Sequence, residues 1–440
     1  MTLAKDMADY AVSLSYDDLG GDVVKEAKRR ILDAVGVSFG ALDAKPVRIA
    51  RSIANRSESG YRASVLGSSK RVPLEEAVFA NGCAVRYLDF NDTYLSKEAM
   101  HPSDNIPAMM AVAEAEGKGG EDVILGTVLA YDVACHLGDA SSIRNRGWDH
   151  VTYIAISSAV GASRIMSLGT EQTMQAINLA ATPNIALRQT RAGELSMWKG
   201  CAAANAIRNG VFASLLAKNG MTGPSPVFEG EMGFFKQVSG EFVMDLNKGG
   251  HKIVETHVKN YPVEYHAMSA VDAVLEVRKK MGRRGVKELT IDTFTVGWKI
   301  IAKDSEKWNP QTKETADHSL PYIVDRALLD GDIWLDSYDR PKIQDSEVRR
   351  LLKVTKVNVD PAYDSLYPGA VPNRVTVKLD GGSEAVEVVY PKGHCKNPLT
   401  DDEVQSKYLK LGAPKDALTK LWNIEKYSAS DVMQSLTGEN

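Results

Sequence analysis

Hydrophobic residues recur at helical spacing through residues 1–265 of the chain. In the segment 21–42, the apolar side chains that share one helical face are Val23, Val24, Ala27, Ile31, Leu32 and Val35. Similar segments begin near Pro73 and near residues 105, 120, 151 and 200. Proline or acidic residues stand at several of their starts and glycines at several of their ends, as is typical of helix boundaries. The pattern therefore predicts a large helical domain.

Two segments of this region, 150–169 and 199–220, are rich in alanine, serine and glycine. Small side chains let two helix backbones approach closely, so we expect these segments to be the central, most buried pair of helices. A Gly/Pro-rich stretch at 220–235 follows them. It is either a structured loop over a site or an ordinary surface connection.

The pattern changes after residue 265. A helical segment at 261–282 precedes strand-like alternation at 286–300, and two alternating runs surround Asp380-Gly381-Gly382, which predicts a β-hairpin. Residues 400–440 return to helical character, with Thr400 in the position of an N-cap.

These patterns predict a mainly α protein with a smaller α+β domain. The large helical domain spans residues 1–265 and is completed by 396–440, and the α+β domain spans 266–395. The length of 440 residues agrees with two domains, because it exceeds a single core of ordinary size.

Composition narrows the functional classes. The net charge of −4 argues against a nucleic-acid partner, which would need a basic patch. No basic leader followed by an apolar stretch is visible, and no apolar run approaches the length of about 20 residues that a membrane span needs. We therefore expect a cytoplasmic protein with no membrane partner.

Cofactor motifs are missing from the sequence. The four cysteines, Cys83, Cys135, Cys201 and Cys395, are far apart and form no CxxC pair. Dinucleotide, P-loop, zinc-protease and GxSxG motifs do not occur either. The sequence thus gives no support for a nucleotide cofactor or zinc-protease chemistry, and if the protein is an enzyme we expect its own side chains to carry the proton transfers.

Polar residues interrupt the apolar pattern between the helices predicted from Pro73 and from residue 105. Arg86, Asp89 and Thr93 would share one face if the first of these helices continued. They are either an ion pair with a hydroxyl neighbour on a solvated face or part of a site. Asp104 is placed to cap the next helix.

Other polar residues stand at predicted helix starts. His101, His150 and His266 each lie just before a helix, as capping residues or as members of a site. Lys199 opens an alanine-rich helix, where burial would demand an anionic partner. Tyr322 lies in a first helical turn set by proline, and its hydroxyl would need a partner if buried. Together with helix N-termini, which favour anions, such residues would suit a polycarboxylate if they converged.

Six segments carry a resemblance to a known family. RYLDFNDTY with HPSDN, GWDH, SMWKGCAAANAIRNG, GMTGP, EGEMGF, and ADHSLPYIV with ALLDG resemble the MmgE/PrpD family in order and spacing over nearly the whole chain. The resemblance implies a large all-α domain built from both chain ends, an inserted α+β domain, a homodimer, and catalysis without metal or organic cofactor.

The resemblance also implies a chemistry. Members dehydrate methylcitrate or citrate, decarboxylate cis-aconitate, or epimerise an imino-disuccinate. Between Thr93 and His101, the decarboxylases carry an extra His-Pro, whereas this chain has Tyr94-Leu95-Ser96-Lys97. We therefore expect a dehydratase of a small tricarboxylate, acting on 2-methylcitrate to give 2-methyl-cis-aconitate, with citrate as a further substrate. A decarboxylase, an epimerase or a non-catalytic carboxylate-binding homologue is the alternative.

The family pattern carries over to seven residues: Asp89, Thr93, His101, His150, Lys199, His266 and Tyr322. His101 is the expected base, with Asp89 orienting or polarising its ring. Tyr322 or His266 is expected to protonate the leaving hydroxyl, because hydroxide leaves poorly by itself. The residues expected to bind the substrate are Thr93, His150, Lys199 and Arg86.

Overall fold

The computed structural model describes residues 2–54, 61–193, 195–282 and 285–437, which form two compact units. The first unit combines both ends of the chain, from residues 1–193, 197–256 and 400–440, and the second is formed mainly by residues 257–399. The structure therefore divides the chain at 256/257 and 399/400, where the hydrophobic pattern places the boundaries at 265/266 and 395/396.

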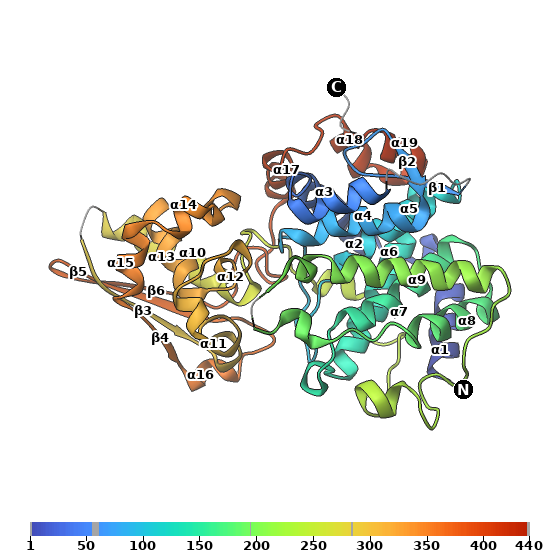
Figure 1. Cartoon of the computed structure of the whole chain (residues 1–440), viewed down its shortest axis with the longest axis horizontal. Helices are drawn as coiled ribbons and strands as arrows, with labels where there is room; N and C mark the ends of the chain where they lie inside the picture. Colours follow the sequence, from blue (N-terminus) through green and yellow to red (C-terminus); the bar gives the residue numbers. More distant parts are fainter. Residues whose placement is uncertain (1, 55–60, 194, 283–284, 438–440) are drawn as a thin grey trace. The chain divides into compact units, whose positions relative to one another are not determined.

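The first unit is mainly helical (Figure 1). Its α-helices are α1 (Leu3–Ser13), α2 (Gly21–Gly40), α3 (Lys45–Ala54), α4 (Leu74–Tyr87), α5 (Ile106–Ala115), α6 (Gly120–Ala140), α7 (Val151–Ile165), α8 (Thr170–Ala181), α9 (Ala202–Lys218), α17 (Asp401–Lys410), α18 (Ala417–Trp422) and α19 (Ala429–Gln434). Two short antiparallel strands, β1 (Arg62–Ser64) and β2 (Arg71–Pro73), also belong to it. The expected mainly α fold is confirmed, but this unit is not all-helical.

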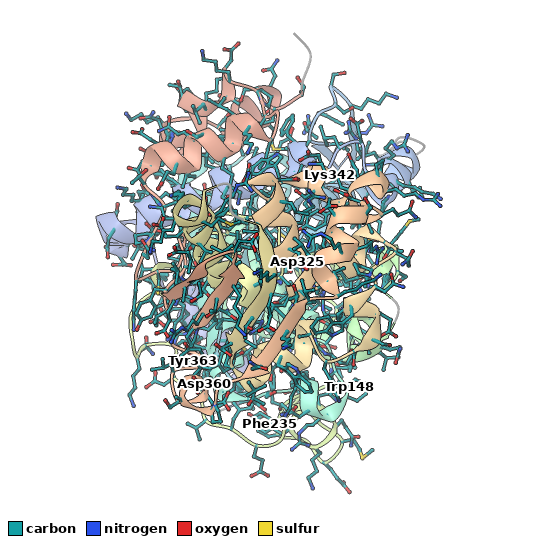
Figure 2. The ribbon with its side chains drawn as sticks, turned by 90° about the vertical axis from the view of Figure 1, so that its left-hand side faces the viewer. Trp148, Phe235, Asp325, Lys342, Asp360 and Tyr363 are labelled. Atoms are coloured by element: carbon teal, nitrogen blue, oxygen red, sulfur yellow. The ribbon has the colours of Figure 1, made fainter. Side chains whose placement is uncertain are left out.

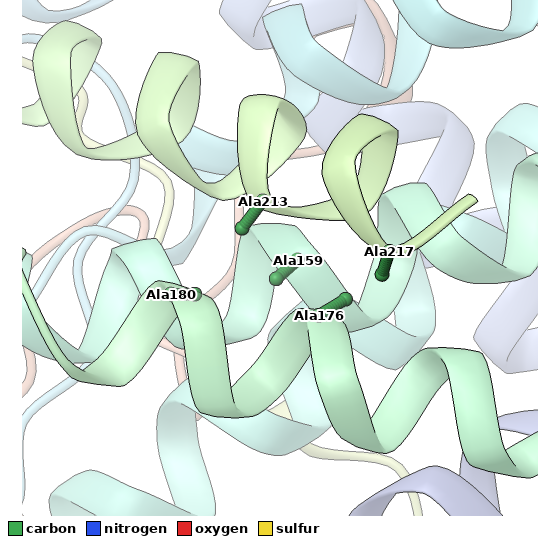
Figure 3. Close-up of a cluster of buried hydrophobic side chains, with 5 residues drawn as sticks. All are labelled: Ala159, Ala176, Ala180, Ala213 and Ala217. Carbon is green, nitrogen blue, oxygen red and sulfur yellow. The ribbon is translucent and has the colours of Figure 1, made fainter. Parts of the chain in front are cut away.

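The helices α7 and α9 form the centre of the first unit, as their small residues predict. Every residue of α7 except Arg164 is buried. An alanine cluster joins α7 and α9 to α8, and its members are Ala159, Ala176, Ala180, Ala213 and Ala217 (Figure 3). Because a methyl group is the largest side chain in this cluster, the three helices pack at short range.

The helix α6 is long and apolar enough to cross a membrane by length and composition. This differs from the expectation that no segment approaches that length. The helix nevertheless lies in the core of the first unit, where 89% of its most apolar window is covered. Packing against α5 and α7 thus accounts for its apolar character.

The second unit holds a four-stranded sheet with the order β4-β3-β5-β6. Its strands are β3 (Val286–Thr293), β4 (Thr355–Val359), β5 (Asn373–Leu379) and β6 (Gly382–Val388). Its α-helices are α10 (Met268–Met281), α11 (Thr295–Ile301), α12 (Lys313–Ala316), α13 (Leu320–Asp330), α14 (Arg340–Ile343), α15 (Ser346–Leu352) and α16 (Pro361–Asp364). The strands β5 and β6 form the predicted hairpin, with Asp380 and Gly381 as its two-residue turn.

Side-chain hydrogen bonds connect helices to the sheet of the second unit. The carboxylate of Asp325 on α13 (Figure 2) accepts a 2.8 Å hydrogen bond from the hydroxyl of Thr355, the first residue of β4.

The predicted strand at 286–300 ends earlier than its alternation suggests. Asp364 accepts hydrogen bonds from the backbone N–H and the hydroxyl of Thr295, at 2.7 and 2.6 Å, so α11 begins at this residue.

Gly210→Ala should destabilise the first unit. A methyl group at this position of α9 would lie 2.5 Å from the carbonyl oxygen of Ala155 on α7. Backbone atoms cannot yield unless the two helices separate, and overpacking of this kind costs about 1–3 kcal/mol. We expect a lower midpoint of thermal unfolding, measured by circular dichroism.

Gly21→Ala is the matched control, because a methyl group there meets no atom within 4 Å. Alanine favours a helix more than glycine does, so this midpoint should stay the same or rise. An equal midpoint for Gly210→Ala and the wild type would contradict the close contact of α7 with α9.

Candidate active site

The segment between α4 and α5 begins with an unusual backbone turn. The helix α4 ends at Tyr87, and Asp89 adopts a left-handed conformation with φ of +52°. Thr93 lies beyond the helix, next to a bridge that pairs Tyr94 with Met100. The prediction that Arg86, Asp89 and Thr93 share one helical face is therefore wrong. Aspartate tolerates the left-handed region better than most residues, which makes the reversal possible here.

The carboxylate of Asp89 lies between two cations. It accepts a 2.6 Å hydrogen bond from Arg86 Nη1 and a 3.1 Å hydrogen bond from Lys199 Nζ. All three side chains are buried. Lys199 lies in the short 3₁₀ helix η5 (Met197–Gly200) that precedes α9. The expected anionic partner of Lys199 is thus Asp89, and the three groups together carry one net positive charge.

His101 lies at the start of the short 3₁₀ helix η2 (Pro102–Asn105), which leads into α5. Its Nδ1 is 2.6 Å from the carbonyl oxygen of Asp92. A carbonyl oxygen can only accept, so Nδ1 carries a proton and Nε2 holds the lone pair of the neutral ring. Nε2 lies 3.7 Å from Oδ1 of Asp89. The orienting contact therefore comes from the Asp92 backbone, whereas Asp89 faces the basic nitrogen.

His150 stands at the N-terminus of α7, and its ring centroid is 5.7 Å from that of His101. Its Nδ1 lies 3.1 Å from Oδ1 of Asp149, and its buried Nε2 has no hydrogen-bond partner. Burial lowers the pKa of His150 well below its ordinary value; Asp149 opposes the shift, and nearby arginines add to it. His150 is therefore neutral near pH 7, and it can offer a substrate only a neutral hydrogen bond.

Two arginines that the sequence pattern does not indicate also belong to this cluster. Arg188 and Arg191 lie in the short 3₁₀ helix η4 (Arg188–Arg191), and Nε of Arg191 is 2.8 Å from Oδ2 of Asp149. Burial disfavours ionisation of Asp149, but Arg191, His150 and Arg188 together hold its pKa at about 2. The only signal for this pair in the sequence is a spacing of three residues shortly before Lys199.

Asp104 does not cap α5 as predicted. It lies inside η2, so its carboxylate points into the unit, where it accepts a 2.9 Å hydrogen bond from Asn91 and lies 3.8 Å from Nε of Arg86. Burial raises the pKa of Asp104 to about 7, although Arg86 and Arg191 oppose the shift. This carboxyl group therefore titrates near neutral pH.

The two other expected site residues, His266 and Tyr322, belong to the second unit. Nδ1 of His266 lies 2.7 Å from a carboxylate oxygen of Glu264, and Nε2 lies 3.5 Å from the hydroxyl of Tyr367. Tyr322 is fully buried, and its hydroxyl donates a 2.5 Å hydrogen bond to the carbonyl oxygen of Ser337. The two residues therefore make separate contacts, and the Tyr322 proton is already committed to a backbone acceptor.

One group of side chains in the second unit has the composition of a metal site. Ligand atoms of His257, His394 and Cys395 lie within 4.8 Å of one another. However, Nδ1 of His257 accepts the backbone N–H of Cys395 at 3.1 Å, and Nδ1 of His394 accepts that of Lys396 at 3.0 Å. The two rings also stack with centroids 4.2 Å apart. A nitrogen lone pair that accepts a hydrogen bond cannot also bind a metal. These contacts therefore fit a turn held together by side-chain hydrogen bonds better than a metal site.

The Gly/Pro-rich stretch at 220–235 is a structured loop with a cavity of its own. The cavity has a volume of about 440 Å³, and its lining consists of residues 224–227, 230–234, 237 and 238 together with Ala181, Thr182 and Ile185. Among the residues that the structure describes, its lining includes none of the eight expected site residues. The loop therefore forms a cavity of its own. The described lining of this cavity is not part of the cluster of side chains around His101.

Comparison with known proteins shows which family the two parts of the chain match. Residues 5–247 match the MmgE/PrpD N-terminal domain, and residues 261–420 match the MmgE/PrpD C-terminal domain. The chain is 27% identical over 418 residues to a 2-methylcitrate dehydratase of Salmonella typhimurium, covering 89% of this chain and 86% of the relative.

Two further relatives are similar. A 2-methylcitrate dehydratase of Escherichia coli K12 is 28% identical over 358 residues, covering 76% of this chain and 74% of the relative. An alkylcitrate dehydratase of a fungal species is 27% identical over 384 residues, covering 80% and 75%. Together, these matches extend over both units.

The stability contributed by Asp104 should depend on pH near neutrality. The ordinary pKa of aspartate is about 4, and that of Asp104 in the folded unit is about 7. Between these values the unfolded chain has lost the proton and the folded unit keeps it, so stability falls as pH rises. Asp104→Asn, which cannot ionise, should therefore gain thermal stability relative to the wild type as pH rises from about 4 to about 7.

The measurement is the difference in unfolding midpoint between variant and wild type at several pH values. Asp416→Asn changes an exposed aspartate of the same unit and is the control. A constant difference for Asp104→Asn across this range would show that the buried carboxyl group does not titrate there.

Proposed function

The chain belongs to the MmgE/PrpD family, and from this premise we propose that it is a dehydratase of a small tricarboxylate that needs no metal or organic cofactor. The favoured reaction is the conversion of 2-methylcitrate to 2-methyl-cis-aconitate, with citrate as a further substrate. Its support comes from relatives named for the dehydration of 2-methylcitrate and of an alkylcitrate. A homodimer and a cytoplasmic location remain predictions.

The geometry of His101 is the observation that carries this proposal. Its Nδ1 is held by the Asp92 carbonyl oxygen at 2.6 Å, which leaves Nε2 as the basic atom. Asp89 lies 3.7 Å from Nε2, so its negative charge stabilises the imidazolium that forms when the ring accepts a proton. A base whose protonated form is stabilised in place suits proton abstraction from carbon.

The substrate proton is weakly acidic and needs help to leave. Dehydration removes a proton from C3 and the hydroxyl group from C2, and the carboxylate next to C3 takes up negative charge as the proton departs. Arg86 and Lys199 carry fixed positive charges beside His101, through the shared partner Asp89. Such preset charges stabilise the developing negative charge without reorganisation.

The leaving hydroxyl takes up a second proton, so that water departs and the C2–C3 double bond forms. Of the two residues expected to supply this proton, Tyr322 donates its own to Ser337. His266 keeps a ring nitrogen 3.5 Å from the hydroxyl of Tyr367 rather than on a backbone carbonyl. We therefore favour His266 over Tyr322 as the general acid.

Residues 94–100 bear on the alternative activities. Tyr94 and Met100 exchange backbone hydrogen bonds of 2.9 and 3.0 Å, which closes the segment into a loop. The hydroxyls of Tyr94 and Ser96 both donate to Asp139 on α6. The side chains found where decarboxylases carry an extra His-Pro are thus engaged in packing, which favours dehydration over decarboxylation.

Turnover assays test the proposal. Purified protein should convert 2-methylcitrate, and more slowly citrate, to an unsaturated acid that absorbs near 240 nm, with equal rates with and without a chelator. Release of carbon dioxide from cis-aconitate would identify a decarboxylase instead. Loss of turnover with chelator would refute the metal-free mechanism, and no turnover of any of these acids would favour a binding protein.

His101→Ala should lower kcat by roughly 100-fold or more, the usual scale for removing a positioned general base. His251→Ala is the control, because it deletes another partly buried imidazole of the first unit, whose partner is Asp132. Circular dichroism would verify folding of both variants. Near wild-type kcat in folded His101→Ala protein would remove His101 from the role of base.

A further inference from the structure

Several buried side-chain nitrogen atoms in the described part of the first unit have no hydrogen-bond partner, and three of them are Arg86 Nε, His150 Nε2 and Arg191 Nη2. Buried polar atoms are nearly always hydrogen-bonded, so each such exception needs an explanation. The three belong to one cluster, because Arg86 and Arg191 both act electrostatically on His150 and on Asp104. Their concentration in one place indicates a polar ligand.

The charges of the cluster indicate an anion. Arg86 and Lys199 share the carboxylate of Asp89. Arg191 pairs with Asp149 at 2.8 Å, and Arg188 acts on the same carboxylate. Four cations therefore face the carboxylates of Asp89 and Asp149, with Asp104 as a third acid that is about half protonated near pH 7. The surplus is positive, as an anionic substrate requires.

His150 is neutral near pH 7 and has no charge with which to hold a carboxylate. Its Nδ1 atom lies 3.1 Å from the ionised carboxylate of Asp149, which stabilises the tautomer that carries the proton at Nδ1. Nε2 is then a bare acceptor. It suits a hydroxyl group of the substrate and would repel a carboxylate, so the second anion partner must be an arginine.

The side chain of Arg191 has the required geometry. Its guanidinium presents five N–H donors in a planar fork, which matches the two oxygens of a carboxylate. The guanidinium lies beside Asp149, with Nε 2.8 Å from Oδ2 in an ion pair, whereas Nη2 is buried and has no hydrogen-bond partner. The ion pair thus positions the guanidinium beside Asp149, and Nη2 is left to bind a ligand.

We propose that Arg191, supported by Arg188, binds a second carboxylate of the substrate, apart from the one held beside Lys199 and Arg86. Two separate cationic points make the first unit selective for acids with carboxylates on different carbons, and a tricarboxylate can satisfy both, with the carboxylate next to C3 beside Lys199 and Arg86. The inference deepens the proposed function by assigning a residue to substrate selection, and it takes from that function only the carboxylate nature of the ligand.

Equilibrium binding to the full chain tests the inference without turnover. Propane-1,2,3-tricarboxylate has no hydroxyl to eliminate and serves as the probe, with the monocarboxylate butanoate, which can occupy only one cationic point, as the comparison. Arg191→Gln should weaken binding of the tricarboxylate by roughly 10- to 100-fold, the range for loss of a charge-assisted contact. Binding of butanoate should fall less, so the preference for the tricarboxylate shrinks. Arg208→Gln, at an exposed site on α9, is the matched control and should change neither affinity.

Removal of Arg191 leaves the buried Asp149 without its ion pair, which endangers folding. The double variant Asp149→Asn/Arg191→Gln removes both charges, and its folding is checked by circular dichroism. It should lose affinity for the tricarboxylate to the same degree. Wild-type affinity in either folded variant would overturn the inference, as would failure of the wild type to bind the tricarboxylate at millimolar concentration.

The two proposals fail in different ways. Protein that binds the tricarboxylate through Arg191 but dehydrates no citrate analogue would refute the proposed function and keep the role of Arg191. Protein that dehydrates 2-methylcitrate with an affinity independent of Arg191 would keep the function and refute the role.

Discussion

The carboxylate of Asp89, buried between Arg86 and Lys199, is the interaction on which the rest of the candidate site depends. A buried ion is costly unless opposite charges and hydrogen bonds compensate for lost water, and here each charge of the triad compensates another. The triad joins the end of α4 to the segment that starts α9, whose small residues pack against α7. Loss of Asp89 would leave the two cations of the triad without their shared partner in the interior.

Buried acceptor groups also determine the chemistry of the two histidines. Each ring has one nitrogen beside a group that can only accept a hydrogen bond: the Asp92 carbonyl for His101 and the Asp149 carboxylate for His150. In the neutral form both rings therefore present a lone pair at Nε2. Their surroundings differ, because His101 has Asp89 beside this atom, whereas His150 is surrounded by guanidinium groups that disfavour its protonation. The ring of His101 thus lies beside an anion, whereas the ring of His150 is held neutral.

Much of the fold follows from local patterns. The helices from Gly21, Leu74, Ile106, Gly120 and Val151 lie where apolar periodicity predicts them, because neighbours three and four residues apart decide which face is buried. The β5–β6 hairpin follows from alternation and an Asp-Gly turn. The errors fall at element ends. The left-handed turn at Asp89, the helical position of Asp104 and the early end of β3 each depend on a contact that lies outside the local pattern.

The sequence by itself determined the class of fold, the positions of the central helices and of the β5–β6 hairpin, and the polar residue types available for catalysis. These properties arise from interactions between near neighbours along the chain. Only the tertiary structure decided that Lys199 pairs with Asp89, 110 residues away, and which nitrogen of His101 holds the lone pair. It also brought Arg191 to Asp149, a pairing with little local signal. Each of these depends on which distant segments share one low-dielectric interior, and that is settled only when the helices pack.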